Sequence, residues 1–214
     1  NKEWVWGYRE TDPMGGFDPY SSSKGCCELI ISSYRRSFFS KTTNASIASA
    51  RAGNVIGGGD WSPDRLIPDI LHAFGKEETV VIRNPKSTRP WQHVLEPLSG
   101  YLLLAQKLYE EGESFSEAWN FGPDDQDCRS VEWILDKVSS LWGSGVSWIL
   151  DENYNPHEAN YLKLDCSKAQ YKMGWVPKWQ LELALNKTVS WYRNWLQGIC
   201  PKKICLDTIK EYKS

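Results

Sequence analysis

The sequence has no long apolar run and no excess of charge of one sign. No stretch approaches the roughly 20 apolar residues that a transmembrane helix needs, so we expect no membrane partner. The 25 basic residues are scattered among 27 acidic ones, and the formal net charge is −2. Electrostatics therefore gives no reason to expect nucleic-acid binding. The chain has 214 residues, of which 41% are hydrophobic, and can bury a core of ordinary size.

Patterns for metal ligation and for disulfide frameworks are also missing. The six cysteines form no Cys-x-x-Cys pair, and the three histidines are far apart in the sequence. The first residues contain no apolar segment of the kind that a secretory signal needs. We therefore expect free thiols in a cytoplasmic protein, and no structural metal.

A third absence is the glycine-rich dinucleotide fingerprint. A doubly wound nucleotide-binding domain opens with a strand, a glycine-rich turn and a helix whose N-terminus holds the pyrophosphate. No G-x-G-x-x-G or G-x-x-G-x-x-G occurs near the N-terminus, and Gly57-Gly58-Gly59 comes too late for that role. We therefore expect the chain to be the second part of such a domain without the first.

The patterns that are present alternate between helix and strand. A helix is expected at 20–39, followed by a buried strand within 46–56 that ends at glycines. Further helices are expected at 66–74, 96–110 and 131–141, further strands at 79–82, 118–122 and 146–150, and two short helical pieces after 165. This alternation predicts an α/β fold: the second part of a doubly wound, Rossmann-like parallel sheet domain, plus a smaller C-terminal substrate-binding region.

Tyr20 and Lys24 are the candidate catalytic residues. At spacing i,i+4 both side chains leave the same face of the expected helix. A phenol with a pKa of about 10 is a poor base near neutrality. A nearby ammonium group favours the phenolate and can turn the phenol into a general base. A solvated tyrosine and a surface lysine would share this spacing, so the flanking residues decide between the two interpretations.

Those flanking residues resemble a known family. Tyr20-x-x-x-Lys24, with Glu10 and Pro13 before it and the segment 51–57 (RAGNVIG) after it, resembles the extended short-chain dehydrogenase/reductase family. Within that family the chain is similar to the CDP-glucose 4,6-dehydratases. The narrower likeness rests on NKEWVWGYRE at 1–10, GGGDW at 57–61, RPWQHV at 89–94 and PHEA at 156–159. It covers nearly all of this chain but only the C-terminal, larger part of a family member.

The resemblance implies an NAD-dependent hydro-lyase that makes CDP-4-keto-6-deoxyglucose from CDP-glucose, for deoxysugar and O-antigen biosynthesis. Such an enzyme oxidises the sugar C4 hydroxyl with tightly held NAD, removes water across C5–C6 and returns the hydride to C6. By resemblance, Tyr20 is the base that takes the C4 hydroxyl proton. Lys24 would make that phenol more acidic and bind the nicotinamide ribose, so both residues also belong to the cofactor site. A homodimer is implied in the same way.

The resemblance also implies further contacts with cofactor and substrate. Asn54 would contact the nicotinamide and the substrate phosphates, although a turn-forming asparagine is an equal alternative. Arg89 would bind the pyrophosphate through its guanidinium fork, with a surface ion pair as the alternative. Leu66 would line the nucleotide base and His157 a phosphate or ribose. Core packing and an ordinary loop histidine explain these last two nearly as well.

Twelve tryptophans raise the question of sugar stacking. Most are explained more simply as core residues, because an indole buries a large area. Only Trp61 and Trp91, which lie within the substrate-like segments, are candidates for such a contact.

These expectations divide the chain into three parts. Residues 1–60 would be the remainder of the NAD-binding domain. Residues 61–200 would mainly bind the nucleotide sugar, with 94–122 returning to the sheet. Residues 201–214 would be a peripheral tail.

Two alternatives to this function remain open. One is another NAD-dependent nucleotide-sugar epimerase or reductase, and the other is an inactive truncated fragment that self-associates. The family's serine or threonine, acidic residue and lysine belong just upstream of Asn1. We therefore expect these 214 residues alone to show no turnover and little NAD affinity.

Overall fold

The computed structural model describes residues 2–39, 45–143, 146–151, 153 and 159–214. The elements in chain order are α1 Pro19–Phe38, β1 Ser49–Ala52, β2 Asn54–Ile56, α2 Leu66–Gly75, β3 Val80–Ile82, β4 Thr88–His93, α3 Leu95–Glu111, η1 Gly112–Phe115, β5 Ala118–Phe121, η2 Asp125–Asp127, β6 Cys128–Ser130, α4 Val131–Trp142, β7 Trp148–Leu150, α5 Ser167–Met173, α6 Leu181–Leu196 and α7 Pro201–Lys213. Every helix and strand expected from the sequence is present.

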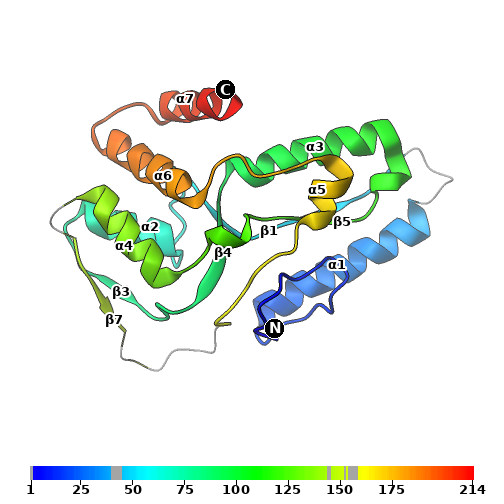
Figure 1. The fold of residues 1–214 in the computed structure, drawn as a ribbon, viewed down its shortest axis with the longest axis horizontal. Coiled ribbons are helices and arrows are strands. Elements are labelled where there is room, and N and C mark those ends of the chain that lie inside the picture. The colour runs from blue at the N-terminus through cyan, green and yellow to red at the C-terminus, as the bar shows by residue number, and fades with distance from the viewer. Residues whose placement is uncertain (1, 40–44, 144–145, 152, 154–158) are drawn as a thin grey trace.

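The strands form small, mostly parallel sheets. β1 pairs with β5, β2 with β4 and β3 with β7, all in parallel, and β6 adds an antiparallel edge to β4. The partners in each parallel pair are far apart in the sequence, and helices fill the connections between them (Figure 1). This crossover arrangement confirms the predicted α/β class with parallel strands.

The sequence did not predict β4, β6 or α7, and it predicted α6 as a short piece. β4 reads Thr-Arg-Pro-Trp-Gln-His, and five of its six residues are buried. Some of its polar groups form hydrogen bonds inside the protein; Gln92 Nε2, for example, donates to the Phe121 carbonyl oxygen at 2.8 Å. Because the strand is buried on both faces and rich in polar residues, it lacks the alternation by which a strand is recognised.

The buried side chains form two core clusters. The first lies between β2, β3, β4 and the helices α2, α4, α6 and α7, and it includes Phe74, Ile134 and Leu185. The second lies beneath α3 and α5 and includes Trp119 and Phe121 of β5. Figure 1 shows the two groups of helices on either side of β4. β4 therefore stands between the two cores.

The C-terminal residues form a docked helix. α7 begins at Pro201 and buries Ile204 in the first core cluster. At its other end the Tyr212 hydroxyl donates to Glu96 Oε2 of α3 at 2.8 Å. Residues 201–213 are thus tied to the body at both ends, although the three-part division of the chain stays a prediction.

Membrane spans and metal-ligand groups were both sought among the described residues. Within those residues, no helix combines the length and apolar character that a bilayer span requires. Across the same ranges, no group of three or more histidine, cysteine, aspartate or glutamate side chains gathers as metal ligands do.

Candidate active site

Tyr20 and Lys24 lie together at the start of α1. Asp18 caps the helix: its carboxylate accepts from the Ser21 backbone N–H at 2.9 Å and from Ser21 Oγ at 2.6 Å. These hydrogen bonds from Ser21 lower the pKa of Asp18. Pro19 then starts the helix, which puts Tyr20 in the first turn and Lys24 one turn later. Lys24 Nζ lies 5.4 Å from the centroid of the Tyr20 ring.

The Tyr20 ring is open to a ligand. Its side chain is 71% exposed, and Lys24 is exposed as well. The loop before the helix folds onto the first turn, because a Cβ on Gly16 would lie only 1.7 Å from Ser21 Oγ. Ser22 Oγ also donates to the Gly16 carbonyl oxygen at 3.1 Å. The approach loop is therefore fixed against the turn that carries the tyrosine.

A partly buried ion pair sets α1 against β1. Glu28 Oε2 accepts from Arg51 Nη2 at 2.7 Å and from Ser49 Oγ at 2.8 Å. Burial opposes ionisation of Glu28, but hydrogen bonds from Arg51 and Ser49 and the Arg51 charge outweigh it and lower the pKa of that carboxyl. Glu10 joins the network: its carbonyl oxygen accepts from Arg51 at 3.3 Å, and its carboxylate accepts from Asn120 N at 2.8 Å.

Sequence reasoning assigned no role to this network, although a signal was present. Arg51 lies in the segment expected to be a buried strand, and a buried guanidinium requires a partner. The network connects the helix of Tyr20 and Lys24 to the strand that leads to Asn54.

Asn54 and Arg89 lie on neighbouring strands. The Cα of Asn54 is opposite Trp91 in the parallel pairing of β2 with β4, and Arg89 is two residues earlier in β4. A Cβ on Gly53 would lie 2.7 Å from the Pro90 carbonyl oxygen, so the two strands meet closely at this point. Arg89 is 7% exposed, which does not fit the alternative of a surface ion pair.

The other predicted site residues are not shown beside Tyr20 and Lys24. Leu66 is the first residue of α2 and packs against the first core cluster, and in Figure 1 α2 lies on the other side of β4 from α1. His157 lies outside the described residues. Trp91 is a core residue, 4% exposed, whose indole N–H donates to the Arg129 carbonyl oxygen at 2.9 Å. The structure therefore does not present Trp91 as a stacking surface.

A pocket that the sequence did not indicate lies beside the approach segment. It has a volume of about 340 Å³ and is lined by Trp4, Trp6, Gly7, Arg9, Asp12 and Asp165. Arg9 Nε pairs with Asp165 Oδ2 at 3.0 Å, which ties the segment before α1 to the loop before α5. None of the predicted site residues lines this pocket.

Comparisons with known proteins find a family model and a curated protein that match this chain. The family model described as GDP-mannose 4,6 dehydratase matches residues 5–188. The CDP-glucose 4,6-dehydratase of Salmonella typhimurium is 58% identical over 211 residues, which are 95% of this chain and 59% of that protein. The chain thus spans about three-fifths of the length of that curated relative.

Two solved structures share the fold. The dTDP-glucose 4,6-dehydratase of Bacillus anthracis, in complex with NAD, has a TM-score of 0.70 and 19% identity over 88% of this chain and 56% of that one. A UDP-glucose 4-epimerase of Stenotrophomonas maltophila with bound NAD has a TM-score of 0.74 and 19% identity, covering 89% of this chain and 59% of that one. At such identities the likeness shows the architecture alone.

Proposed function

Because the chain belongs to the GDP-mannose 4,6-dehydratase family, we propose that it is part of an NAD-dependent nucleotide-sugar 4,6-dehydratase that converts CDP-glucose to CDP-4-keto-6-deoxyglucose. The observation that carries this proposal is an exposed Tyr20 with the Lys24 ammonium beside it, in a chain 58% identical to a CDP-glucose 4,6-dehydratase. We propose a place in deoxysugar and O-antigen biosynthesis, and a cytoplasmic location, on the same likeness.

The residues of α1 fit the task of a base. Oxidation at the sugar C4 requires its hydroxyl proton to leave as the hydride departs. The Tyr20 phenol oxygen would accept that proton, with the Lys24 ammonium group one turn away on the same face of the helix. The exposed ring and the fixed approach loop leave a sugar hydroxyl free to reach this phenol.

An NAD molecule would fit beside the same two side chains. When bound, NAD supplies the acceptor for the hydride. Lys24 would hold the nicotinamide ribose, because its ammonium group is exposed at the Tyr20 ring. Asn54 would contact the nicotinamide from the start of β2, which follows directly after β1, the strand that the Glu28–Arg51 pair places against α1.

The remaining proposed contacts are with the nucleotide part of the substrate. Arg89 would bind the pyrophosphate, for which its planar donor fork is suited. Leu66 would line the nucleotide base, and His157 would contact a phosphate or ribose.

A homodimer is proposed from the exposed face of α1. Gly25 is the one buried residue of this helix, and Leu29, Ile30, Tyr34 and Phe38 are each more than half exposed. Such an apolar face on an otherwise polar helix is suited to packing against a second copy.

Product analysis tests the proposed function. The full-length protein that contains this chain is incubated with CDP-glucose, and the sugar nucleotides are identified by mass spectrometry. Loss of one water from the substrate, with retention of the CDP moiety, is the expected result. An unchanged mass with inversion at C4 would show an epimerase instead.

Parallel incubations with dTDP-, UDP- and GDP-sugars test the nucleotide preference. The expectation that these 214 residues alone give no turnover stays a prediction.

A further inference from the structure

The loop of residues 57–60 connects two parts of the proposed substrate site. β2, with Asn54, ends just before it, and α2, with Leu66, begins after it. The conformation of this loop therefore affects where both residues lie. Its glycines lack side chains that could fix that conformation, so it must be held from outside.

Trp191 of α6 packs directly on the loop backbone. A Cβ on Gly58 would lie 2.0 Å from Trp191 Cγ, and Gly59, at φ +81°, would place a Cβ 3.3 Å from Trp191 Cζ2. The Trp191 indole is 5% exposed, and its N–H points to Cys205 Sγ of α7 at 3.3 Å. Glycine is therefore required at residue 58, and α7 supports the indole from behind.

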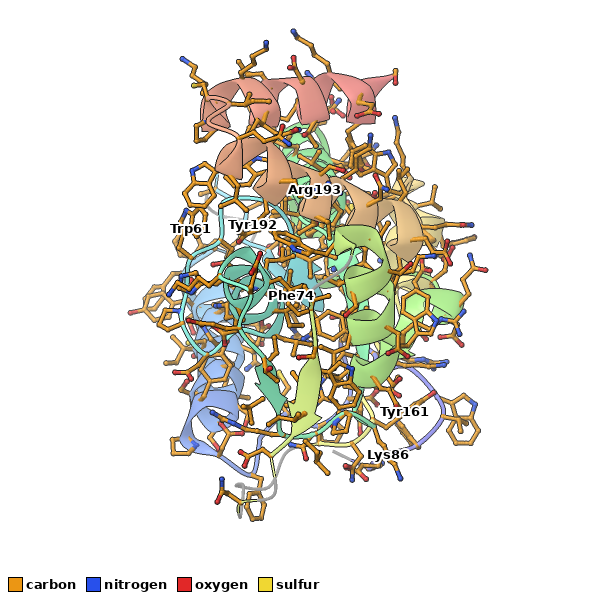
Figure 2. The ribbon with its side chains drawn as sticks, turned by 90° about the vertical axis from the view of Figure 1, so that its left-hand side faces the viewer. Trp61, Phe74, Lys86, Tyr161, Tyr192 and Arg193 are labelled. Atoms are coloured by element: carbon orange, nitrogen blue, oxygen red, sulfur yellow. The ribbon has the colours of Figure 1, made fainter. Side chains whose placement is uncertain are left out.

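Tyr192 holds the same loop by a hydrogen bond. Its hydroxyl donates to the Asp60 carbonyl oxygen. The side chain is 2% exposed, and burial raises the pKa of Tyr192 to about 12, so the hydroxyl remains a donor at neutral pH. The Trp61 ring completes the contact, with its centroid 5.2 Å from Tyr192 and 4.5 Å from Trp195. Figure 2 shows Trp61 lying beside Tyr192.

We propose that Trp191 and Tyr192 are positioning residues of the nucleotide-sugar site, which fix the backbone of residues 58–60 and thereby the placement of Asn54 and Leu66. The inference rests on the proposed function for the identity of the ligand. It also gives Trp61 a different role from sugar stacking: its ring is engaged with α6 and fastens the loop.

The test is Tyr192→Phe in the full-length protein, which keeps the ring and removes the donor. We expect amide hydrogen exchange in peptides covering residues 54–66 to be faster by roughly threefold to tenfold, the range for one lost hydrogen bond. The KM for CDP-glucose should rise by a similar factor while kcat stays within about twofold, because the chemistry at Tyr20 is not touched.

Tyr212→Phe is the matched control. It removes another tyrosine hydroxyl, partly buried, which donates to Glu96 away from the loop. We expect it to lower the melting temperature and leave both the exchange of residues 54–66 and the KM at wild-type values. A purely structural role for Tyr192 would make the two variants behave alike.

Gly58→Ala provides a second variant, because its new methyl group must displace the loop from Trp191. It too should raise the KM. Unchanged exchange in Tyr192→Phe, or faster exchange with an unchanged KM in both variants, would overturn the inference. Wild-type turnover of CDP-glucose reports on the proposed function separately. An inactive wild type rejects that function and with it the substrate role, whereas the exchange comparison still decides whether α6 holds the loop.

Discussion

At the scale of single residues, Glu96 shows how the protein accommodates a polar side chain in its interior. Glu96 is fully buried, and its carboxylate accepts from the backbone N–H groups of Lys178 at 2.9 Å and Trp179 at 2.8 Å and from the Tyr212 hydroxyl. Burial also raises the pKa of Tyr212, which keeps its hydroxyl a donor. Three donors therefore meet the two oxygens of this carboxylate, as a buried polar group requires.

His93 is the buried residue with a consequence for pH dependence. It is 3% exposed at the end of β4, packs 5.0 Å from the Trp179 ring and accepts a hydrogen bond from Leu95 N at its Nδ1. Burial, with a smaller contribution from the Lys187 charge, lowers the pKa of His93 to about 4. The folded protein therefore keeps this imidazole neutral, and protonation favours the unfolded chain.

We predict that this difference appears in the free energy of unfolding. The stabilisation is complete above the unfolded pKa of about 6.5 and is lost as the pH falls toward the folded value. At pH 5 the His93 contribution should be lower by about 2 kcal/mol than at pH 8. Urea unfolding of wild type and His93→Gln at the two pH values measures it. The variant should lose that part of the pH dependence. An equal change in the free energy of unfolding between pH 8 and pH 5 for the two proteins would refute the assignment.

At the scale of elements, the sequence predicted the helices and strands that have a regular residue pattern and a turn residue at one end. The helices expected at 96–110 and 131–141 are observed as α3 and α4, and the strand expected to end at glycines is observed as β2. β4 was not predicted because it is buried on both faces and its polar residues remove the alternation by which a strand is recognised. The i,i+4 spacing predicted that Tyr20 and Lys24 would meet, but no local pattern could reveal the Glu28–Arg51 link between α1 and β1.

That link gives a prediction about α1. Arg51→Met removes the guanidinium and leaves the Glu28 carboxylate largely buried without its ion-pair partner. We expect the free energy of unfolding to fall by roughly 1–3 kcal/mol, less than for a fully buried pair. Amide exchange in α1 should rise as the helix loosens from β1. Arg9→Met, which breaks a more exposed pair, is the control and should cost less than about 1 kcal/mol.

Equal losses of stability in the two variants would contradict this account of α1. So would unchanged exchange across the helix in Arg51→Met. Either result would mean that packing, and not the ion pair, sets the position of Tyr20 and Lys24 relative to β1.

At the scale of the whole molecule, the two cores are arranged on either side of β4, and one helix stands out by its exposed apolar face. α1 leaves Ile30, Tyr34 and Phe38 on its surface, with the Tyr34 and Phe38 rings 5.3 Å apart. The chain spans 59% of the length of its Salmonella relative.

We predict that the isolated 214-residue chain self-associates through α1. Light scattering at micromolar concentrations should give a mass of at least two chains. Ile30→Lys should shift the equilibrium toward the monomer, because it puts a charge into the apolar face. Leu102→Lys, at a residue of α3 that is 74% exposed, should leave the mass unchanged. A clean monomer for the wild-type chain would remove the basis for the proposed dimer.

The central claim is that the Tyr20 phenol, with the Lys24 ammonium beside it, is the base of the reaction. The most direct measurement is single-turnover oxidation of CDP-glucose by the full-length protein carrying Tyr20→Phe, followed as NADH absorbance. We predict a rate at least about 100-fold below wild type, with Tyr109→Phe, which alters a 93% exposed tyrosine on α3, at the wild-type rate. Hydride transfer at an undiminished rate in Tyr20→Phe would contradict the assignment of the base.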